Sequence, residues 1–192
     1  MSENHRKQRT IIVGVCGGIA AYKVVDVVNE LTKEGHTVHV IMTQNATQFV
    51  TPLTFQTLSH QKVVVDQFDP IEKWDTEHIS LAKKADLFVV APATANIIGK
   101  MAHGLADDML TTTLLATRAP KVIFPAMNTA MWENPIVQDN VDRLRRFGYR
   151  VEGTDDGYLA CGDTGSGKLL PVATILEHIR AMLQTDNQDS LA

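Results

Sequence analysis

The chain has 192 residues, of which 44% are hydrophobic, and a formal net charge of −4 from 18 Lys and Arg against 22 Asp and Glu. This length and apolar content suit one compact domain rather than several. The basic residues are scattered apart from Arg143, Arg145 and Arg146. Because no basic stripe indicates DNA or RNA binding, we predict no nucleic-acid partner.

Two cysteines, Cys16 and Cys161, lie far apart in the chain. They form neither a disulfide framework nor the paired spacing of metal ligands, so we expect a cytoplasmic protein without a metal site. The first ten residues are polar, and no apolar run reaches about 18 residues. We therefore expect a protein that is neither exported nor membrane-spanning.

Short apolar runs rich in β-branched residues are typical of strands buried on both faces. In chain order they are residues 11–15, 38–42, 87–91, 122–124 and the weaker 149–151. Apolar residues at helical spacing predict helices over 19–31, 53–58, 79–85, 97–116 with a break at Gly104, 136–147 and 172–183. This alternation predicts an α/β fold, a single-domain doubly wound parallel sheet of the Rossmann or flavodoxin-like kind with helices on both faces.

The domain is expected to span residues 11–183, with a disordered N-terminus over 1–10 and a flexible tail over 184–192. Within it, residues 153–170 are rich in glycine and show no clear periodicity. A loop of this length in a compact domain is usually functional or disordered.

The first predicted strand runs into Gly17 and Gly18, where backbone N–H groups could approach an anion at the start of a helix. The spacing is not that of a dinucleotide fingerprint, and the second strand ends at Thr43 without an acidic residue for a ribose diol. The pattern therefore favours FMN, held by the Thr43 hydroxyl and loop amides, over NAD or NADP. A tight turn without a ligand is the alternative.

Several stretches together resemble the flavin-dependent cysteine decarboxylases, in particular the branch that acts on phosphopantothenoylcysteine in coenzyme A synthesis. They are GGIAAYK, EHISLA, APATANIIGKMAHGLADDML, PAMNTAMWENP and LACGDTGSGK, between about residues 11 and 179. Two positions depart from the family pattern. Ile97 replaces a hydroxyl residue in the Pro92–Ile97 motif, and Lys168 stands where many relatives carry Arg.

The resemblance implies an FMN enzyme that converts 4′-phosphopantothenoylcysteine to 4′-phosphopantetheine. The substrate thiol would be oxidised to a thioaldehyde, CO2 would leave, and the product would be re-reduced. The resemblance also implies a homotrimer or a multiple of trimers, because FMN in this family lies between subunits. The synthetase activity of fused relatives would then reside on a separate chain.

The resemblance assigns site residues in three groups. The catalytic residues are His78, as acid or base facing the flavin of a neighbouring subunit, and Cys161, as the final proton donor. The flavin-binding residues are Gly17, Gly18, Ile19, Thr43, Thr94, Ala95, Asn96, Ile97 and Ala126. The substrate-binding residues are Asn128, Tyr158, Leu159, Ala160 and Lys168.

Plainer interpretations exist for three of these residues. His78 could be an exposed residue at a helix start, Asn128 could merely form an Asx-turn, and a lone Cys such as Cys161 is usually structural or incidental. If Asn128 does bind substrate, its amide could hold a carboxylate without a positive charge that would keep CO2 from leaving. The glycines of 153–170 would let the loop close over substrate as a lid, with Asp163 and Lys168 as polar contacts.

Three other functions are compatible with parts of the pattern. A peptidyl-cysteine decarboxylase of the lantibiotic type would perform the same chemistry on a peptide. A non-catalytic flavin-binding regulatory subunit would carry long acidic extensions, and this chain instead has His78 and Cys161. A flavin prenyltransferase would lack the Pro125–Trp132 motif and the 153–170 segment that this chain contains.

Overall fold

The computed structural model describes residues 8–68 and 76–189. Its centre is a five-stranded sheet, all parallel, in the order β2-β1-β3-β4-β5. The strands are β1 Thr10–Val15, β2 Thr37–Met42, β3 Leu87–Ala93, β4 Lys121–Pro125 and β5 Arg150–Val151. This is the flavodoxin-like strand order, so the predicted fold class is confirmed.

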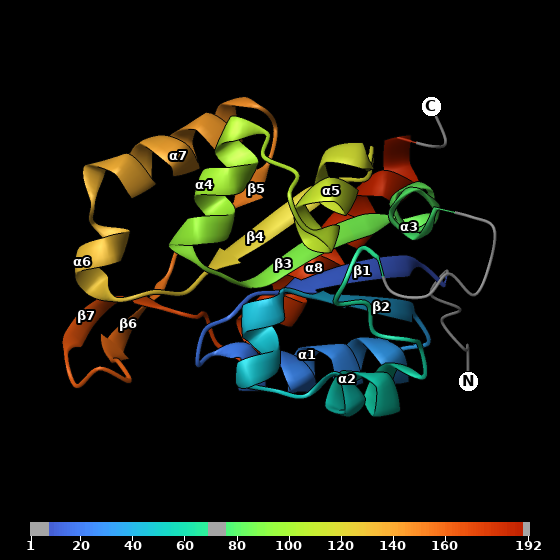
Figure 1. Ribbon diagram of the computed structural model, residues 1–192, viewed down its shortest axis with the longest axis horizontal. Coiled ribbons are helices and arrows are strands. Elements are labelled where there is room, and N and C mark those ends of the chain that lie inside the picture. The colour runs from blue at the N-terminus through green and yellow to red at the C-terminus, as the bar shows by residue number, and fades with distance from the viewer. Residues whose placement is uncertain (1–7, 69–75, 190–192) are drawn as a thin grey trace.

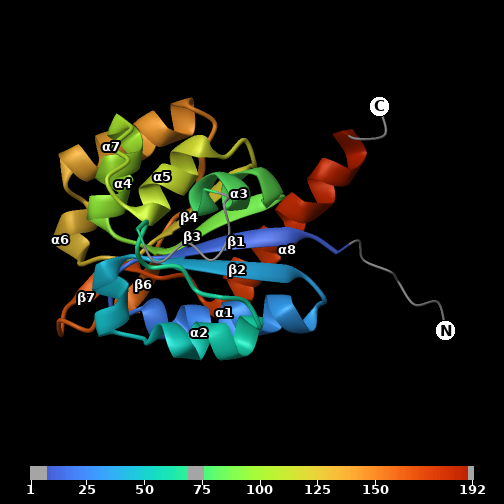
Figure 2. The same ribbon diagram turned by 45° about the vertical axis from the view of Figure 1, so that its right-hand side comes forward.

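Helices cover both faces of the sheet (Figure 1). One face carries α3 Glu77–Lys84, α4 Ala95–His103, α5 Met109–Ala116 and α7 Pro135–Arg146. The other carries α1 Ala21–Lys33, α2 Pro52–Ser59 and α8 Val172–Asp189, and the turned view in Figure 2 separates the two layers. Two short helices, η1 Gln44–Gln48 and α6 Thr129–Trp132, follow β2 and β4.

The core has two parts because successive residues of a strand point to opposite faces. In β1, Ile11 and Val13 pack with the α1 and α8 layer, whereas Ile12 packs with α4 and α5. Gly14 lies on the α5 side, and a Cβ there would come within 2.5 Å of Leu110 Cδ1. A glycine at this point therefore lets α5 lie close against β1.

Glycine marks one of the helix boundaries, as predicted, whereas the ends of the chain differ from the prediction. The long segment 97–116 is divided into α4 and α5 at Gly104, whose φ of +68° is the left-handed conformation that ends a helix. The last helix extends to Asp189 rather than ending at 183. At the N-terminus, β1 already begins at Thr10, whose N–H donates to Asp86 Oδ2 at 2.7 Å, and residues 1–7 lie outside the described part.

Residues 153–170 differ from the expected irregular loop. They form an antiparallel hairpin of β6 Asp155–Tyr158 and β7 Thr164–Lys168, separate from the main sheet. The sequence did not reveal these strands because neither DDGY nor TGSGK alternates apolar and polar residues. Figure 1 shows the hairpin at the left end of the molecule, beyond the carboxyl ends of β3 and β4.

No helix within residues 8–68 and 76–189 is long and apolar enough to cross a membrane.

Candidate active site

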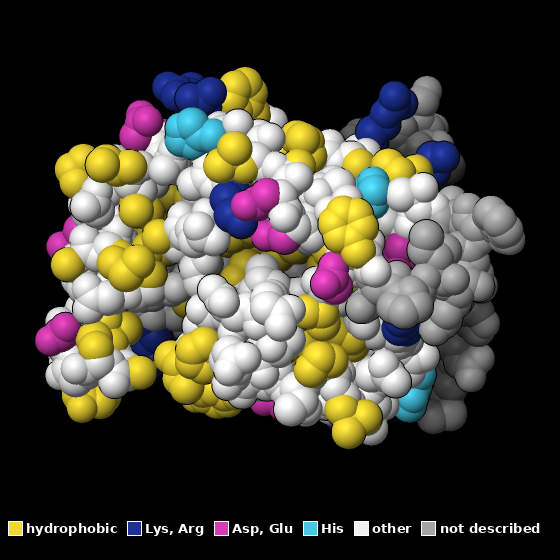
Figure 3. Space-filling view, viewed as in Figure 1, with side chains coloured by type: hydrophobic (Ala, Val, Ile, Leu, Met, Phe, Trp, Pro, Cys, Tyr) yellow, Lys and Arg dark blue, Asp and Glu magenta, His cyan; other side chains and the backbone are white. Residues whose placement is uncertain are grey.

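The strand order reverses between β1 and β3, and in sheets of this kind ligands bind beyond the carboxyl ends of the strands at that point. Three loops meet there. A Cβ placed on Gly18, after β1, would lie 3.9 Å from Thr94 Cγ2, after β3. A Cβ on Gly17 would lie 2.5 Å from the Cβ of Asn45, after β2. Figure 3 shows this face hollowed between the α4–α5 layer and the elements on the other side of the sheet, with hydrophobic side chains inside the hollow.

Unused backbone donors gather at this point. Within the described part of the chain, the N–H groups of Gly17, Ile19, Ala95 and Asn96 donate to no protein acceptor. Ala95 and Asn96 begin α4, where the helix dipole also favours negative charge, and Gly17 and Ile19 lie in the turn that leads into α1. Such a set of donors fits an anionic mononucleotide such as FMN.

The two predicted threonines cap the helices that follow them. Thr43 Oγ1 accepts from the Ala46 N–H at 3.2 Å, and Thr94 Oγ1 accepts from the Ile97 N–H at 3.4 Å. Because a hydroxyl can donate and accept, each keeps a proton that a ligand could receive. No acidic or Arg side chain follows β2 at residues 43–46, so the site lacks the usual partner for the adenosine ribose of NAD or NADP.

Other predicted flavin residues shape the crevice rather than offer polar groups. The Ile97 side chain is buried in the core, and its N–H is already bonded to Thr94. The Ala126 N–H donates to Ala93 O at 2.9 Å, which ties the end of β4 to the end of β3. Ile19, in contrast, is 56% exposed at the start of α1, so its apolar side chain remains available to a ring.

The β6–β7 hairpin is fixed against the segment that follows β4. The Met127 N–H donates to Gly167 O at 2.8 Å, and Thr129 Oγ1 donates to Ser166 O at 2.7 Å. Gly167 has a φ of +108°, and a Cβ at that position would overlap Met127 O. The close approach of the two backbones therefore requires glycine at position 167.

We predict that Gly167→Ala lowers the free energy of unfolding by about 1–3 kcal/mol, since it combines a left-handed φ with a steric overlap. It should also weaken substrate binding, because the hairpin can no longer lie against Met127. Thermal unfolding and KM measure the two effects. Gly153→Ala is the matched control, since nothing lies within 4 Å of a Cβ there and its φ is not in the left-handed region. Equal effects of the two substitutions would contradict this account of the hairpin.

The hairpin brings two predicted residues together that are 33 positions apart. Asn128 Nδ2 lies 3.3 Å from Cys161 Sγ, and both groups contact the Asp163 carboxylate. Asn128 also caps α6, since its Oδ1 accepts from the Ala130 N–H at 2.9 Å. The Asx-turn interpretation of Asn128 is therefore correct, and the same side chain still presents its NH2 group to the hairpin.

The other four predicted substrate residues differ in exposure and in the groups that they contact. Tyr158 is 72% exposed and Ala160 is exposed, whereas Leu159 is buried and its N–H donates to Asp163 O at 2.8 Å. Lys168 Nζ lies 3.9 Å from Asp155 Oδ2, so its charge is partly matched within the hairpin. Of these residues, Leu159 is tied directly to the Asp163 that contacts Asn128 and Cys161.

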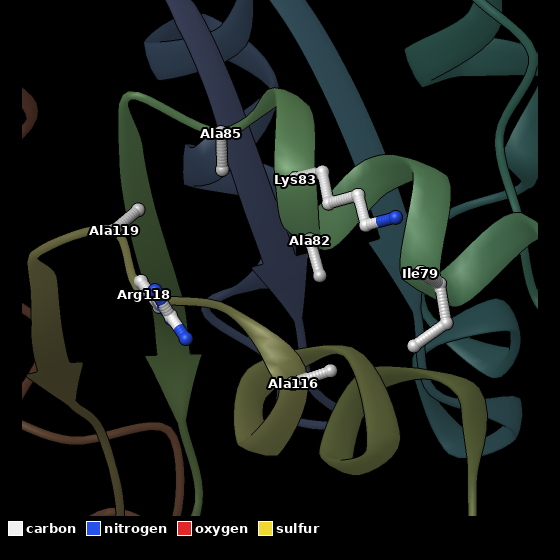
Figure 4. Close-up of a pocket in the computed structure, with 7 residues that line it drawn as sticks. All are labelled: Ile79, Ala82, Lys83, Ala85, Ala116, Arg118 and Ala119. Carbon is white, nitrogen blue, oxygen red and sulfur yellow. The ribbon is translucent and has the colours of Figure 1, made fainter.

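His78 does not join this group within one chain. It is half-buried at the start of α3, which Figure 1 shows at the right end of the molecule, opposite the hairpin. Next to it, Ile79 borders a hollow of about 470 Å³ between α3 and α5 (Figure 4). The hollow is otherwise lined by four alanines and the cations Lys83 and Arg118, and contains none of the predicted flavin or substrate residues.

Sequence reasoning gave no role to an ion pair beside the crevice. Lys100 Nζ on α4 lies 2.7 Å from Asp107 Oδ1 and 3.1 Å from Asp108 Oδ2, and its side chain is 19% exposed. The pair ties α4 to the first turn of α5 near Cys16, whose thiol has a pKa raised to about 12 by burial. The predicted helix break at Gly104 separates these residues, so their helical spacing carried no signal.

Among residues 8–68 and 76–189, no group of three or more His, Cys, Asp or Glu side chains is arranged to hold a metal ion.

Comparison with known proteins places the chain among flavoproteins. The flavoprotein family model matches residues 1–184. A Streptococcus mutans protein named "Probable phosphopantothenoylcysteine decarboxylase" is 45% identical over 177 residues, which cover 91% of this chain and 99% of that protein. The Bacillus subtilis coenzyme A biosynthesis bifunctional protein CoaBC is 50% identical over 161 residues, 84% of this chain and 40% of that protein. The chain thus spans about two fifths of the length of such bifunctional relatives.

Solved structures agree with these relatives. A PPC decarboxylase cysteine-to-serine mutant, complexed with pantothenoylaminoethenethiol, superposes with a TM-score of 0.83 at 28% identity and covers 93% of this chain and 100% of that one. SpaF, an FMN-dependent cysteine decarboxylase, superposes with a TM-score of 0.77 at 33% identity, covering 93% and 97%. The chain belongs to the flavoprotein family, in the group that includes the phosphopantothenoylcysteine decarboxylases.

Proposed function

We propose that the chain is an FMN-dependent decarboxylase that converts 4′-phosphopantothenoylcysteine to 4′-phosphopantetheine in coenzyme A synthesis. The observation that carries this proposal is the contact of Asn128 Nδ2 with Cys161 Sγ, at 3.3 Å, on a hairpin beyond the carboxyl ends of the sheet. A neutral amide beside a thiol supplies, at one place, a hydrogen-bond donor for a carboxylate and a group that can give up a proton. The similarity to a phosphopantothenoylcysteine decarboxylase over nearly its whole length supports the same substrate.

The donors at the strand ends would hold the cofactor. The free N–H groups of Gly17 and Ile19 suit the phosphate, and those of Ala95 and Asn96, with the Thr43 and Thr94 hydroxyls, suit other polar atoms of the flavin. Bound FMN supplies a two-electron acceptor that is restored in each turnover, so the reaction has no net redox change. FMN is favoured over a dinucleotide because no acidic side chain follows β2.

The chain's own residues then act on the substrate. His78 serves as acid or base when the substrate thiol is oxidised to a thioaldehyde. Asn128 donates to the carboxylate without adding positive charge, so the carboxylate can leave as CO2 while the C=S bond accepts the electron pair. Cys161 gives its proton to a carbon of the resulting enethiolate when the C=C bond of that species is reduced. The aminoethenethiol bound to the related decarboxylase mutant is an unreduced species of this kind.

His78 and Cys161 would meet only across a subunit interface, because α3 and the hairpin lie at opposite ends of one chain. We therefore propose a homotrimer, or a multiple of trimers, in which each site takes His78 from one subunit and Cys161 from the next. Exposed apolar side chains after β4, such as Met131 on α6 and Ile136 on α7, are available for such contacts. The oligomer is thus part of the active site.

Co-expression of His78→Asn and Cys161→Ser chains tests this arrangement. Each variant alone is expected to be inactive. Random mixing in a closed trimer leaves both groups intact at about a quarter of the interfaces, so the mixture should regain about a quarter of the wild-type activity. Mixed trimers that regain no activity would contradict a site shared between subunits.

The strongest alternative is a peptidyl-cysteine decarboxylase, because SpaF has a similar fold and higher identity than the PPC decarboxylase structure. The flavin-loaded protein should be given phosphopantothenoylcysteine and, separately, a peptide ending in cysteine, and the CO2 released from each should be measured. We expect CO2 from the former and little from the peptide. CO2 from the peptide alone would overturn the proposed substrate, and no CO2 from either would favour a non-catalytic flavin-binding subunit.

A further inference from the structure

The carboxylate of Asp163 occupies the centre of the Asn128 and Cys161 pair. One oxygen, Asp163 Oδ2, accepts from Asn128 Nδ2 at 3.2 Å and from Cys161 Sγ at 3.3 Å. The tip of the hairpin is closed around it, since the Asp163 carbonyl accepts from the Leu159 N–H and the Leu159 carbonyl accepts from the Gly162 N–H. Asp163 therefore holds the thiol and the amide at one point.

The orientation of the Asn128 amide is fixed by its other contact. Oδ1 accepts from the Ala130 N–H, so the NH2 group must point to the hairpin. A carboxylate can only accept hydrogen bonds, which agrees with this orientation. Asn128 thus offers the hairpin a donor and no acceptor.

The two groups that donate to the Asp163 carboxylate, the Asn128 amide and the Cys161 thiol, are uncharged. Within residues 8–68 and 76–189, no Lys, Arg or His forms an ion pair with it, and the hairpin's Lys168 lies near Asp155. Cys161 and Asp163 are exposed, and Asn128 is half-buried. A carboxylate held by one amide and one thiol at an accessible point can be displaced by another carboxylate.

We propose that Asp163 is a positioning residue. Its carboxylate occupies the place of the substrate carboxylate on Asn128 until substrate arrives, and after CO2 has left it draws the Cys161 thiol back beside the Asn128 amide. This inference rests on the proposed function, which assigns Asn128 to the substrate carboxylate. Two carboxylates cannot share the Asn128 NH2 group without repulsion, so substrate displaces Asp163 and the hairpin tip with it. Loss of CO2 removes the competitor. Asp163 then rebonds to Nδ2 and brings its hydrogen-bonded partner Cys161 to the carbon that needs a proton.

Alkylation of Cys161 in the flavin-loaded full chain tests the competition without the substrate. Iodoacetate carries a carboxylate and iodoacetamide does not, so the ratio of their rates measures how well a carboxylate reaches Asn128 beside Sγ. Cys161 is exposed, whereas Cys16 is fully buried with a pKa of about 12 and will not compete for reagent.

Asp163→Asn removes the charge with little change in shape, and we expect it to raise the iodoacetate to iodoacetamide ratio about fivefold. Asp156→Asn is the matched control, because it removes the same charge from an exposed position on β6. It should leave the ratio unchanged. Adding Asn128→Ser to Asp163→Asn keeps a helix cap but removes the NH2 group, and should cancel the gain. Dividing by the iodoacetamide rate of the same variant cancels any change in the reactivity of the thiol itself.

A ratio that Asp163→Asn raises no more than Asp156→Asn does would overturn the proposal. So would a gain that persists without the Asn128 amide, because repulsion alone would then account for it. Failure of the proposed function is measured separately, as absence of CO2 release from phosphopantothenoylcysteine by the wild-type protein. The alkylation ratio tests the competition of Asp163 for the Asn128 amide in either case.

Discussion

Replacing Cys161 with serine is expected to stop the reaction after CO2 has left. The serine hydroxyl can keep the hydrogen bonds of Cys161 Sγ to Asn128 and Asp163, both at 3.3 Å, but it is a far weaker acid than a thiol. Complete turnover should therefore fall by about 10²–10⁴-fold, the usual contribution of a positioned acid. CO2 release is expected in a single burst, close to one equivalent per site.

In the Cys161→Ser variant, the two electrons taken from the substrate thiol should also remain on the flavin. Under anaerobic conditions the visible flavin absorption should bleach with the CO2 burst, and an oxidised enethiol product should be recovered. Cys16→Ala is the control, because Cys16 is buried and we give it only a packing role. Normal turnover by Cys161→Ser would show that another group donates the proton.

Replacing His78 with asparagine is expected to remove the first step and leave the flavin bound. The predicted flavin residues lie at the carboxyl ends of β1, β2, β3 and β4, away from α3, so the variant should be yellow. Both CO2 release and flavin bleaching by substrate should fall by about 10²–10⁴-fold. This pattern differs from that of Cys161→Ser, which still bleaches.

His103→Asn is the matched control for His78. His103 is exposed at the end of α4, and its Nδ1 lies 2.9 Å from the carbonyl oxygen of Gly99. This variant should decarboxylate at the wild-type rate. If substrate bleaches the flavin of His78→Asn as fast as that of the wild type, His78 has no part in thiol oxidation.

Much of the fold could be predicted from local patterns. Buried parallel strands read as short β-branched runs, and glycines at helix ends mark the boundaries, as Gly104 does between α4 and α5. The hairpin could not be predicted in this way. β7 is held by hydrogen bonds from the Met127 N–H and the Thr129 hydroxyl to its backbone carbonyls rather than by an apolar face, so the hairpin leaves no periodicity in the sequence.

The sequence nominated candidate site residues but not their arrangement. The motifs nominated Asn128 and Cys161 separately, whereas their contact and the central place of Asp163 depend on how the hairpin folds back over 33 to 35 positions. Similarly, no local pattern indicated that α3 lies at the far end of the molecule from the hairpin, and only the family resemblance placed His78 beside the flavin of a neighbouring subunit. Long-range contacts of this kind arise from topology and are invisible to local spacing.

The central claim is that CO2 leaves only because a bound flavin first makes the substrate sulfur able to accept electrons. The most direct test is to strip the flavin, add phosphopantothenoylcysteine labelled in its carboxylate, and count labelled CO2 before and after riboflavin phosphate is restored. We predict no release from the colourless protein and recovery in proportion to the flavin bound. Release of labelled CO2 at the same rate without flavin would contradict the account.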